Sequence, residues 1–202
     1  MNGPVVLVDY GAGNLQSVRN ALRAAGAENV VVTADPDAVS TADRVVLPGV
    51  GAFAHCMMAL SAIDGMVEAL GTATGTGGKP FLGICVGMQL MAEAGEEHGC
   101  HAGLGWIKGS VCAMPGNDQI KIPHMGWNEV VPTGDHPLLR AGEAYFLHSF
   151  AFEGESVLAM TTHGGRVVAA IGEGNRIGVQ FHPEKSQRYG LEFLSRFLDW
   201  KP

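Results

Sequence analysis

The chain has 202 residues, a formal net charge of −7 and a hydrophobic fraction of 47%. This length and apolar content suit a globular chain with a sizeable core. With no run of lysine and arginine and no apolar run of about 18 residues, the sequence argues against a nucleic-acid-binding surface and a membrane span.

The first half of the chain predicts alternating strands and helices. Val5–Val8 is a continuous run of valine and leucine, which is typical of a strand buried on both faces. Asn14 can cap a following helix, whose apolar residues keep helical spacing. The predicted strands are Val5–Val8, Val30–Thr33, 44–47 and 81–84; the predicted helices are 14–26, 52–70 and one that opens after Cys85, with a loop of small residues at 71–78.

The second half predicts short strands separated by glycine and proline turns, followed by one amphipathic helix at about 187–200. No linker or repeat divides the chain, so we expect a single domain over residues 1–202. The fold class is α/β, with a mostly parallel or mixed central sheet covered by helices; the order of its strands is not predicted. The predicted short strands are 109–112, 120–122, 129–131, 144–149, 157–162, 167–171 and 177–181.

The segment GICVGMQ, residues 83–89, sets a cysteine between two glycines where a strand turns into a helix. This G-x-C-x-G pattern is the cysteine form of the nucleophile elbow, a strained turn that exposes its central residue. The new helix directs N–H groups and partial positive charge toward the sulfur of Cys85, which favours the thiolate. The alternative is a buried structural cysteine with two incidental glycines.

A candidate base for that thiol follows the last predicted strand, in the sequence IGVQFHPE at residues 177–184. Side chains at i and i+2 of an extended chain face the same side, and Pro183 favours an extended His182. Glu184 can therefore orient His182, which completes a triad with Cys85 as nucleophile. The alternative is a structural histidine at a strand end with a surface glutamate beside it.

Acyl transfer also needs hydrogen-bond donors for the tetrahedral oxyanion. The N–H of Val86, the residue after the nucleophile, is one candidate. The sequence PGVG at 48–51 supplies others, at Val50 and Gly51, because its glycines allow peptide orientations closed to other residues. The alternative is a plain turn between a strand and a helix.

Together these motifs resemble the class I, triad-type glutamine amidotransferases. Five further segments resemble the glutaminase subunits of imidazole glycerol phosphate synthases: DYGAGNLQSV at 9–18, PGVGAF at 48–53, PHMGWN at 123–128, YFLHS at 145–149 and GVQFHPEKS at 178–186. The resemblance extends over essentially the whole chain, in order, and it implies a flavodoxin-like architecture.

The resemblance implies a reaction divided between two subunits of a heterodimer. Cys85 would attack the side-chain amide of glutamine and form a γ-glutamyl thioester; His182 would protonate the ammonia and then activate water, while Glu184 orients His182. The ammonia would pass through a tunnel to a (β/α)8-barrel cyclase subunit. The synthase, a lyase of histidine biosynthesis, would form imidazole glycerol phosphate and aminoimidazole carboxamide ribotide. No cofactor and no metal is implied.

The same resemblance assigns substrate contacts. Gln89, one helical turn after Cys85, would contact the α-amino acid group of glutamine, together with Gly51 and the backbone of Ser149 and Phe150. The usual residue after His-Ser is tyrosine, so Phe150 keeps a backbone contact and loses any hydroxyl contact. The 48–51 loop would supply oxyanion N–H groups by reorienting when the partner binds its ligand.

The resemblance also places three residues at the interface with the cyclase. Trp127 lies in a predicted loop at 123–128, and an exposed tryptophan is a common interface hot spot. Tyr145 would lie near the interface, and Lys185 would form an ion pair across it. The alternatives are core aromatic residues and an ordinary solvated lysine.

Other readings of the sequence stay open beside this one. They are a glutaminase that feeds another synthase, such as the pyridoxal phosphate one, a redox-sensing protein that uses Cys85, and a binding subunit without activity. Gly11–Ala12–Gly13 lacks the third glycine of a dinucleotide fingerprint. The segment 96–101 lacks a second ligand pair at zinc-like spacing, so a solvated loop is expected there.

The cysteines and the N-terminus bear on location. Four scattered cysteines form no CxxC pair and no disulfide-rich pattern, which is typical of a reducing compartment. The first residues, MNGPVVLVDYG, show no basic segment and no cleavage site, so no signal peptide is expected. We therefore expect a cytoplasmic protein.

Overall fold

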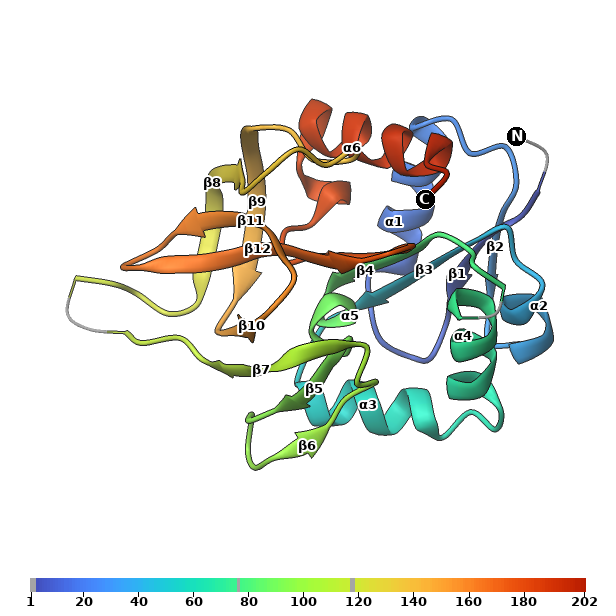
Figure 1. Ribbon diagram of the computed structural model, residues 1–202, viewed down its shortest axis with the longest axis horizontal. Coiled ribbons are helices and arrows are strands. Elements are labelled where there is room, and N and C mark those ends of the chain that lie inside the picture. The colour runs from blue at the N-terminus through green and yellow to red at the C-terminus, as the bar shows by residue number, and fades with distance from the viewer. Residues whose placement is uncertain (1–2, 76, 117–118) are drawn as a thin grey trace.

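The computed structural model describes residues 3–75, 77–116 and 119–202 (Figure 1). Residues 1–2, which belong to the N-terminal segment where no signal peptide is expected, lie outside the described residues. Residue 76, in the predicted loop of small residues, lies outside them as well. So do residues 117–118.

A nine-stranded mixed sheet forms the centre of the fold, with the order β2-β1-β3-β4-β13-β12-β11-β8-β9. The first five strands in that order run parallel and the rest pair antiparallel. The prediction of a mixed central sheet is therefore confirmed. The strands are β1 Val5–Val8, β2 Val30–Thr33, β3 Arg44–Gly49, β4 Phe81–Cys85, β8 His124–Pro132, β9 Gly142–His148, β11 Val157–Thr162, β12 Arg166–Glu173 and β13 Arg176–Val179.

Helices cover both faces of the parallel part. Helices α1 (Leu15–Ala24) and α6 (Gln187–Asp199) lie on one face, and α2 (Pro36–Ser40), α3 (Phe53–Ser61) and α4 (Met66–Thr74) lie on the other (Figure 1). The predicted cap of α1 is confirmed, because the Asn14 side chain accepts a hydrogen bond from the N–H of Ser17 at 3.3 Å.

The prediction of one helix over 52–70 was wrong. Helices α3 and α4 are separate, because Gly65 adopts a φ of 75° that a helix interior does not allow. Residues 71–74, predicted as loop, continue α4. No single helix in the described ranges is long and apolar enough to cross a membrane; α3 and α4 pass that test only as a pair bent by 94°.

A second, four-stranded sheet of order β10-β7-β5-β6 was not predicted. Residues 120–122, predicted as a strand, form only an isolated bridge at Ile120. Because β10 directly follows β9, the turn at Ser149 connects the two sheets. The strands are β5 Ala92–Gly95, β6 His101–Ala102, β7 Ile107–Ala113 and β10 Phe150–Gly154.

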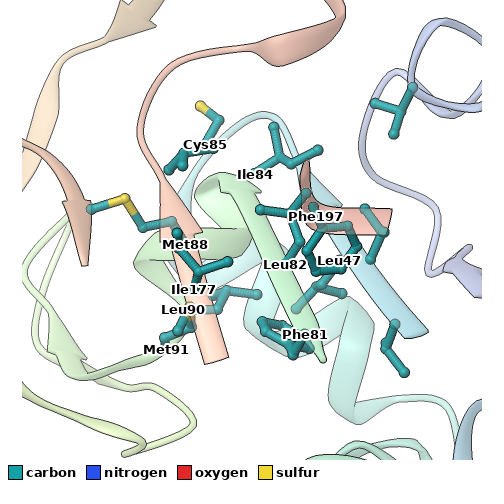
Figure 2. Close-up of a cluster of buried hydrophobic side chains, with 14 of the residues drawn as sticks. Leu47, Phe81, Leu82, Ile84, Cys85, Met88, Leu90, Met91, Ile177 and Phe197 are labelled. Atoms are coloured by element: carbon teal, nitrogen blue, oxygen red, sulfur yellow. The ribbon is translucent and has the colours of Figure 1, made fainter. Parts of the chain in front are cut away.

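The core packs around β4, between β3 and β13. Figure 2 shows Leu47, Phe81, Leu82, Ile177 and Phe197 gathered along these strands, and all five side chains are fully buried. Burying each such side chain stabilises the fold by about 1.5–3 kcal/mol. The cluster therefore holds the three strands rigidly beneath their carboxyl ends.

The carboxyl ends of these three parallel strands meet at one edge of the sheet. Gly49 at the end of β3 is the register partner of Cys85 at the end of β4. On the other side of β4, Val179 of β13 pairs with Ile84. Ligand sites of α/β sheets lie outside such strand ends, so the topology directs attention to this edge.

A substitution at Gly87 tests how tightly this edge of the sheet is packed. A Cβ at Gly87 would overlap the carbonyl oxygen of Leu47, a backbone atom of a central strand that cannot move aside. We expect Gly87→Ala to lower the free energy of unfolding by at least about 3 kcal/mol in urea titrations. Gly71→Ala, in an α4 helix position with nothing within 4 Å of the new Cβ, is the matched control. It should stabilise the protein by about 0.5–1 kcal/mol; equal effects at both positions would contradict this picture of the turn.

Candidate active site

Cys85 occupies a strained turn between β4 and the short helix α5 (Val86–Gln89). Its φ of 54° and ψ of −112° lie where residues with a side chain are rarely found. A Cβ at Gly83 would come within 2.6 Å of the Gly87 carbonyl oxygen, so both motif glycines are required by close packing. The predicted elbow geometry is confirmed, and Figure 2 shows the sulfur pointing away from the apolar cluster.

Two polar groups flank the sulfur of Cys85. The carbonyl oxygen of Leu147 lies 3.8 Å away, where it can accept the thiol proton. The side-chain amide of Gln180 lies on another side, with its Nε2 at 3.6 Å. The Leu147 carbonyl, an acceptor, can therefore stabilise the thiol, and the Gln180 amide, a donor, can stabilise the thiolate.

His182 and Glu184 form a buried pair. His182 Nδ1 lies 2.9 Å from Glu184 Oε1, and the side chains are only 3% and 2% exposed. Burial alone would lower the pKa of His182, but its contacts with Cys85 and Glu184 raise the value to about 9. The ring is therefore protonated near neutral pH, which suits an imidazolium beside a thiolate.

The prediction that an extended chain pairs Glu184 with His182 was only partly right. His182 is extended, with φ −100° and ψ 99°, as expected before a proline. The chain then turns into a short 3-10 helix, Pro183–Lys185, and this turn rather than a continued strand brings the carboxylate of Glu184 to the ring.

The described structure contains a pocket of about 290 Å³ at this edge of the sheet. It brings together every predicted catalytic, oxyanion and substrate residue except Glu184, which reaches it through His182. Apart from its interaction with the Cys85 side chain, His182 Nε2 is buried without a hydrogen-bond partner among the described residues, so it can act on a bound molecule. The lining residues are Val50, Gly51, Cys85, Val86, Gln89, Glu97, Pro123, Leu147, His148, Ser149, Phe150, His182 and Lys185.

The 48–51 loop is held by two buried donors. The hydroxyl of Tyr10 donates to the Pro48 carbonyl at 2.7 Å, and the thiol of Cys56 donates to the Val50 carbonyl at 3.4 Å. Burial raises the pKa of Cys56, which keeps that thiol protonated and able to donate. Because the Gly51 N–H lies trans to the Val50 carbonyl in one peptide plane, it points away from Cys56.

Glu97 is a pocket residue that the sequence did not single out. Helix α3 has no capping side chain of its own, and Glu97 Oε2 accepts the N–H of Phe53 at 2.8 Å instead. Residues 96–100 form the expected exposed loop, in which Glu97 is half-buried. Among described residues, no group of three or more histidine, cysteine or acidic side chains could hold a metal ion.

Gln89 is buried rather than exposed on the surface of its helix. Its Nε2 donates to the Phe150 carbonyl at 3.1 Å and to Gln180 Oε1 at 3.0 Å. The Phe150 carbonyl also accepts from His148 Nδ1 at 2.9 Å, and the Ser149 carbonyl accepts from the N–H of Met114 at 3.0 Å. Both carbonyls of this turn are therefore already engaged.

Behind the pocket lies a chain of neutral histidines. Because His148 Nδ1 donates to a carbonyl, its Nε2 accepts from His124 Nδ1 at 2.9 Å, and His124 Nε2 accepts from Asn128 Nδ2 at 3.0 Å. Burial is the main cause that lowers the pKa of both His124 and His148 to about 4. His124 is stacked between Phe146 and His163, with ring centroids at 4.7 and 4.3 Å.

Two of the predicted interface residues lie on strands β8 and β9, and the third, Lys185, ends the 3-10 helix beside them. Trp127 is the register partner of Tyr145, with ring centroids 6.2 Å apart, and Lys185 Nζ lies 5.7 Å from the Tyr145 ring. Trp127 belongs to strand β8, so its placement in a loop was wrong. Trp127 is 47% exposed, and its exposed neighbours Met125 and Leu147 extend the surface. We call Met125, Trp127, Tyr145 and Leu147 the β8–β9 face.

The histidine chain predicts a loss of stability in mild acid. In the folded chain His124 and His148 stay neutral down to about pH 4, whereas the unfolded chain takes up protons below about pH 6.5. Between about pH 6.5 and pH 4 the unfolded state therefore binds more protons than the folded state. In this window each of the two histidines lowers the free energy of unfolding by about 1.4 kcal/mol per pH unit as the pH falls.

His124→Gln removes one titrating ring and keeps a donor and an acceptor. Urea unfolding at pH 7.5 and pH 5 should show a smaller acid loss in this variant than in the wild type. A loss of the same size in both proteins would mean that the acid sensitivity arises elsewhere.

Comparison with known proteins agrees with this geometry. The family Glutamine amidotransferase class-I matches residues 6–200. The imidazole glycerol phosphate synthase subunit HisH of Zymomonas mobilis is 67% identical over 205 residues, covering 98% of this chain and 96% of that protein. The subunit HisH of Rhodopseudomonas palustris is 50% identical over 214 residues, covering 98% and 99%.

Solved structures support the fold alone, because their sequence identity is low. A crystal structure of glutamine amidotransferase has a TM-score of 0.73 at 19% identity, covering 95% of this chain and 98% of that chain. PurLQS from Thermotoga maritima has a TM-score of 0.71 at 20% identity, covering 98% and 97%. With the family match and the close relatives, these findings show that the chain belongs to the class-I glutamine amidotransferases and, within them, to the HisH subunits of imidazole glycerol phosphate synthase.

Proposed function

We propose that this chain hydrolyses glutamine to glutamate and ammonia, and passes the ammonia to the cyclase subunit of an imidazole glycerol phosphate synthase in histidine biosynthesis. The observation that carries the proposal is the joint position of Cys85 and His182 in one pocket, with Glu184 2.9 Å behind the imidazole. A redox sensor would need neither the buried carboxylate nor a pocket of this size.

The triad supplies the chemistry of both half-reactions. The Cys85 thiolate attacks the side-chain amide carbon of glutamine, and the His182 imidazolium gives its Nε2 proton to the departing ammonia. A water molecule then loses a proton to Nε2 and attacks the thioester, which releases glutamate and restores the thiolate. The pKa of about 9 at His182 favours the starting ion pair near neutral pH. Glu184 holds the ring through Nδ1 and stabilises its charge.

The oxyanion that forms on the amide carbon needs donors beside the sulfur. We assign them to the N–H of Val86 and to the 48–51 loop, at Val50 and Gly51. In the loop, the carbonyl of Val50 is bound by Cys56, so the Gly51 N–H faces the other way. Val50, Gly51 and Val86 line the same pocket as Cys85, as this role requires.

The orientation of bound glutamine follows from the pocket atoms that are not already used in hydrogen bonds within the protein. The carbonyls of Ser149 and Phe150 are engaged, so the α-carboxylate of glutamine would bind donor groups at this turn and at Gly51. The α-ammonium group would be met by acceptors, namely the side-chain oxygen of Gln89 and the Glu97 carboxylate. Phe150 offers no hydroxyl, so its contribution comes from its backbone.

The partner proposal rests on the β8–β9 face and on Lys185. An exposed tryptophan beside apolar and aromatic neighbours is the composition of an interface centre. We infer that a (β/α)8-barrel cyclase subunit covers this face, forming a heterodimer in which Lys185 makes an ion pair. One domain over residues 1–202 and a cytoplasmic location belong to the same proposal.

Replacing the nucleophile tests the reaction. Glutamate release from glutamine, measured in the complex with the cyclase and its ribotide ligand, should fall at least about 10³-fold in Cys85→Ala. Cys112→Ala, at a cysteine of β7 outside the pocket, is the matched control and should keep wild-type activity. Hydrolysis that survives in Cys85→Ala would refute the mechanism.

Replacing the interface tryptophan tests the partner surface. Trp127→Ala should raise the Kd for the cyclase about 30-fold, which corresponds to about 2 kcal/mol for a hot-spot aromatic residue. Met58→Ala, at a 65% exposed methionine of α3, should leave the Kd unchanged. Isothermal titration calorimetry measures both; equal affinity of Trp127→Ala and wild type would place the interface elsewhere.

A further inference from the structure

Gln180 is a buried side chain for which the mechanism above has no role. It lies between the end of β13 and His182, and it is 0% exposed. An amide buried this completely must find hydrogen-bond partners, because an unpaired polar group in the interior costs about 1–3 kcal/mol. Its partners are two residues of the site, Gln89 and Cys85.

The orientation of both amides follows from a single carbonyl. The Phe150 carbonyl can only accept, so the Gln89 atom 3.1 Å from it is the NH2 group. The same NH2 lies 3.0 Å from Gln180, so the atom of Gln180 that meets it is the oxygen. The NH2 of Gln180 is therefore the group that faces Cys85, at 3.6 Å from the sulfur.

This direction matters for the charge state of Cys85. A thiol can donate its proton to the Leu147 carbonyl, 3.8 Å away, and then gains little from a second donor beside it. A thiolate has no proton to give and accepts from the NH2 of Gln180, and hydrogen bonds to an ionised group are the stronger ones. The donor is thus placed to stabilise the charged form.

The same contact also fixes what Gln89 presents to the pocket. Both N–H bonds of its amide are used, one by Phe150 and one by Gln180. The remaining polar atom of Gln89 is its oxygen, which accepts and does not donate. Gln180 therefore keeps Gln89 in the orientation that suits an ammonium group.

We propose that Gln180 is a positioning residue of the site, which donates a hydrogen bond to the Cys85 thiolate through Nε2 and locks the amide of Gln89 through Oε1. The kinetic consequences rest on the glutaminase function proposed above. The effect on the thiol does not, because it can be read without glutamine.

The rate of Cys85 alkylation by iodoacetamide, followed between pH 5 and pH 10 by peptide mass spectrometry, tests the donor. In Gln180→Met, which keeps the length and loses the donor, the rate at pH 7 should fall about tenfold and the curve should move to higher pH. At pH 10 the rate should equal that of the wild type. A curve that coincides with the wild type, or one lowered equally at every pH, would overturn the proposal.

Two controls separate this effect from general damage. Asn175→Ala removes another amide that donates to two backbone carbonyls, those of Thr74 and Lys79 at the opposite end of β13, and should leave the Cys85 curve unchanged. Cys100, which is exposed, is an internal reference in every sample. A shift of the Cys85 curve in Asn175→Ala would also overturn the assignment.

A second variant covers the case in which Gln180→Met does not fold, and it separates the two contacts. Gln180→Glu keeps the acceptor for Gln89 but replaces the donor with a negative charge, so the alkylation curve should move further to high pH. In glutamine hydrolysis it should lower kcat with little change in KM, whereas Gln180→Met should also raise KM. If the wild type releases no glutamate, the proposed function fails while the alkylation curves still decide the role of Gln180.

Discussion

The close approach of the turn after β4 to the end of β3 is the constraint on which the site depends. Gly87 packs against the backbone of Leu47 with no space for a Cβ, and Gly83 has the same relation to Gly87. This packing leaves Cys85 with its strained backbone and projects its sulfur beyond the strand ends. The strain of that residue, of order 1–3 kcal/mol, is offset by the buried cluster beneath it.

The carbonyl of Phe150 then connects site residues that come from the two sheets and from helix α5. The Phe150 oxygen, at the start of β10 in the second sheet, accepts from Gln89 of α5 and from His148 of β9. Through His148 it is connected to His124 on β8, and through Gln89 to Gln180 after β13. Each of these hydrogen bonds has one allowed direction, so the buried polar groups specify one arrangement of the two sheets.

The triad could be predicted from the sequence because its chemistry is local. Cys85 is identified by glycines two residues away on each side, and His182 by a carboxylate two residues later. Gln180 and Glu97 could not be found in this way. Gln180 meets Gln89 across 91 residues of sequence, and Glu97 meets Phe53 across 44, so only the folded topology reveals either contact.

The errors in the fold prediction have one local cause and several long-range ones. The apolar spacing over 52–70 fits one helix, and only the positive φ of Gly65 divides it. The second sheet was missed because β5 and β6 are short and because β7 pairs with β10, which lies far along the chain at Phe150–Gly154. Trp127 was assigned to a loop on its neighbouring glycine, whereas pairing of β8 with β9 makes it a strand residue.

The site and the proposed interface are parts of one surface, and this has a chemical consequence. Leu147 belongs to the β8–β9 face and also lines the pocket, where its carbonyl is a neighbour of the Cys85 sulfur. Lys185 lines the pocket too, and its Nζ lies over the ring of Tyr145. A protein that covers this face therefore also borders the chamber in which ammonia is released. Binding of that protein would screen the chamber from bulk solvent, so that the ammonia does not escape, and would bring its own surface to the point where the leaving group departs.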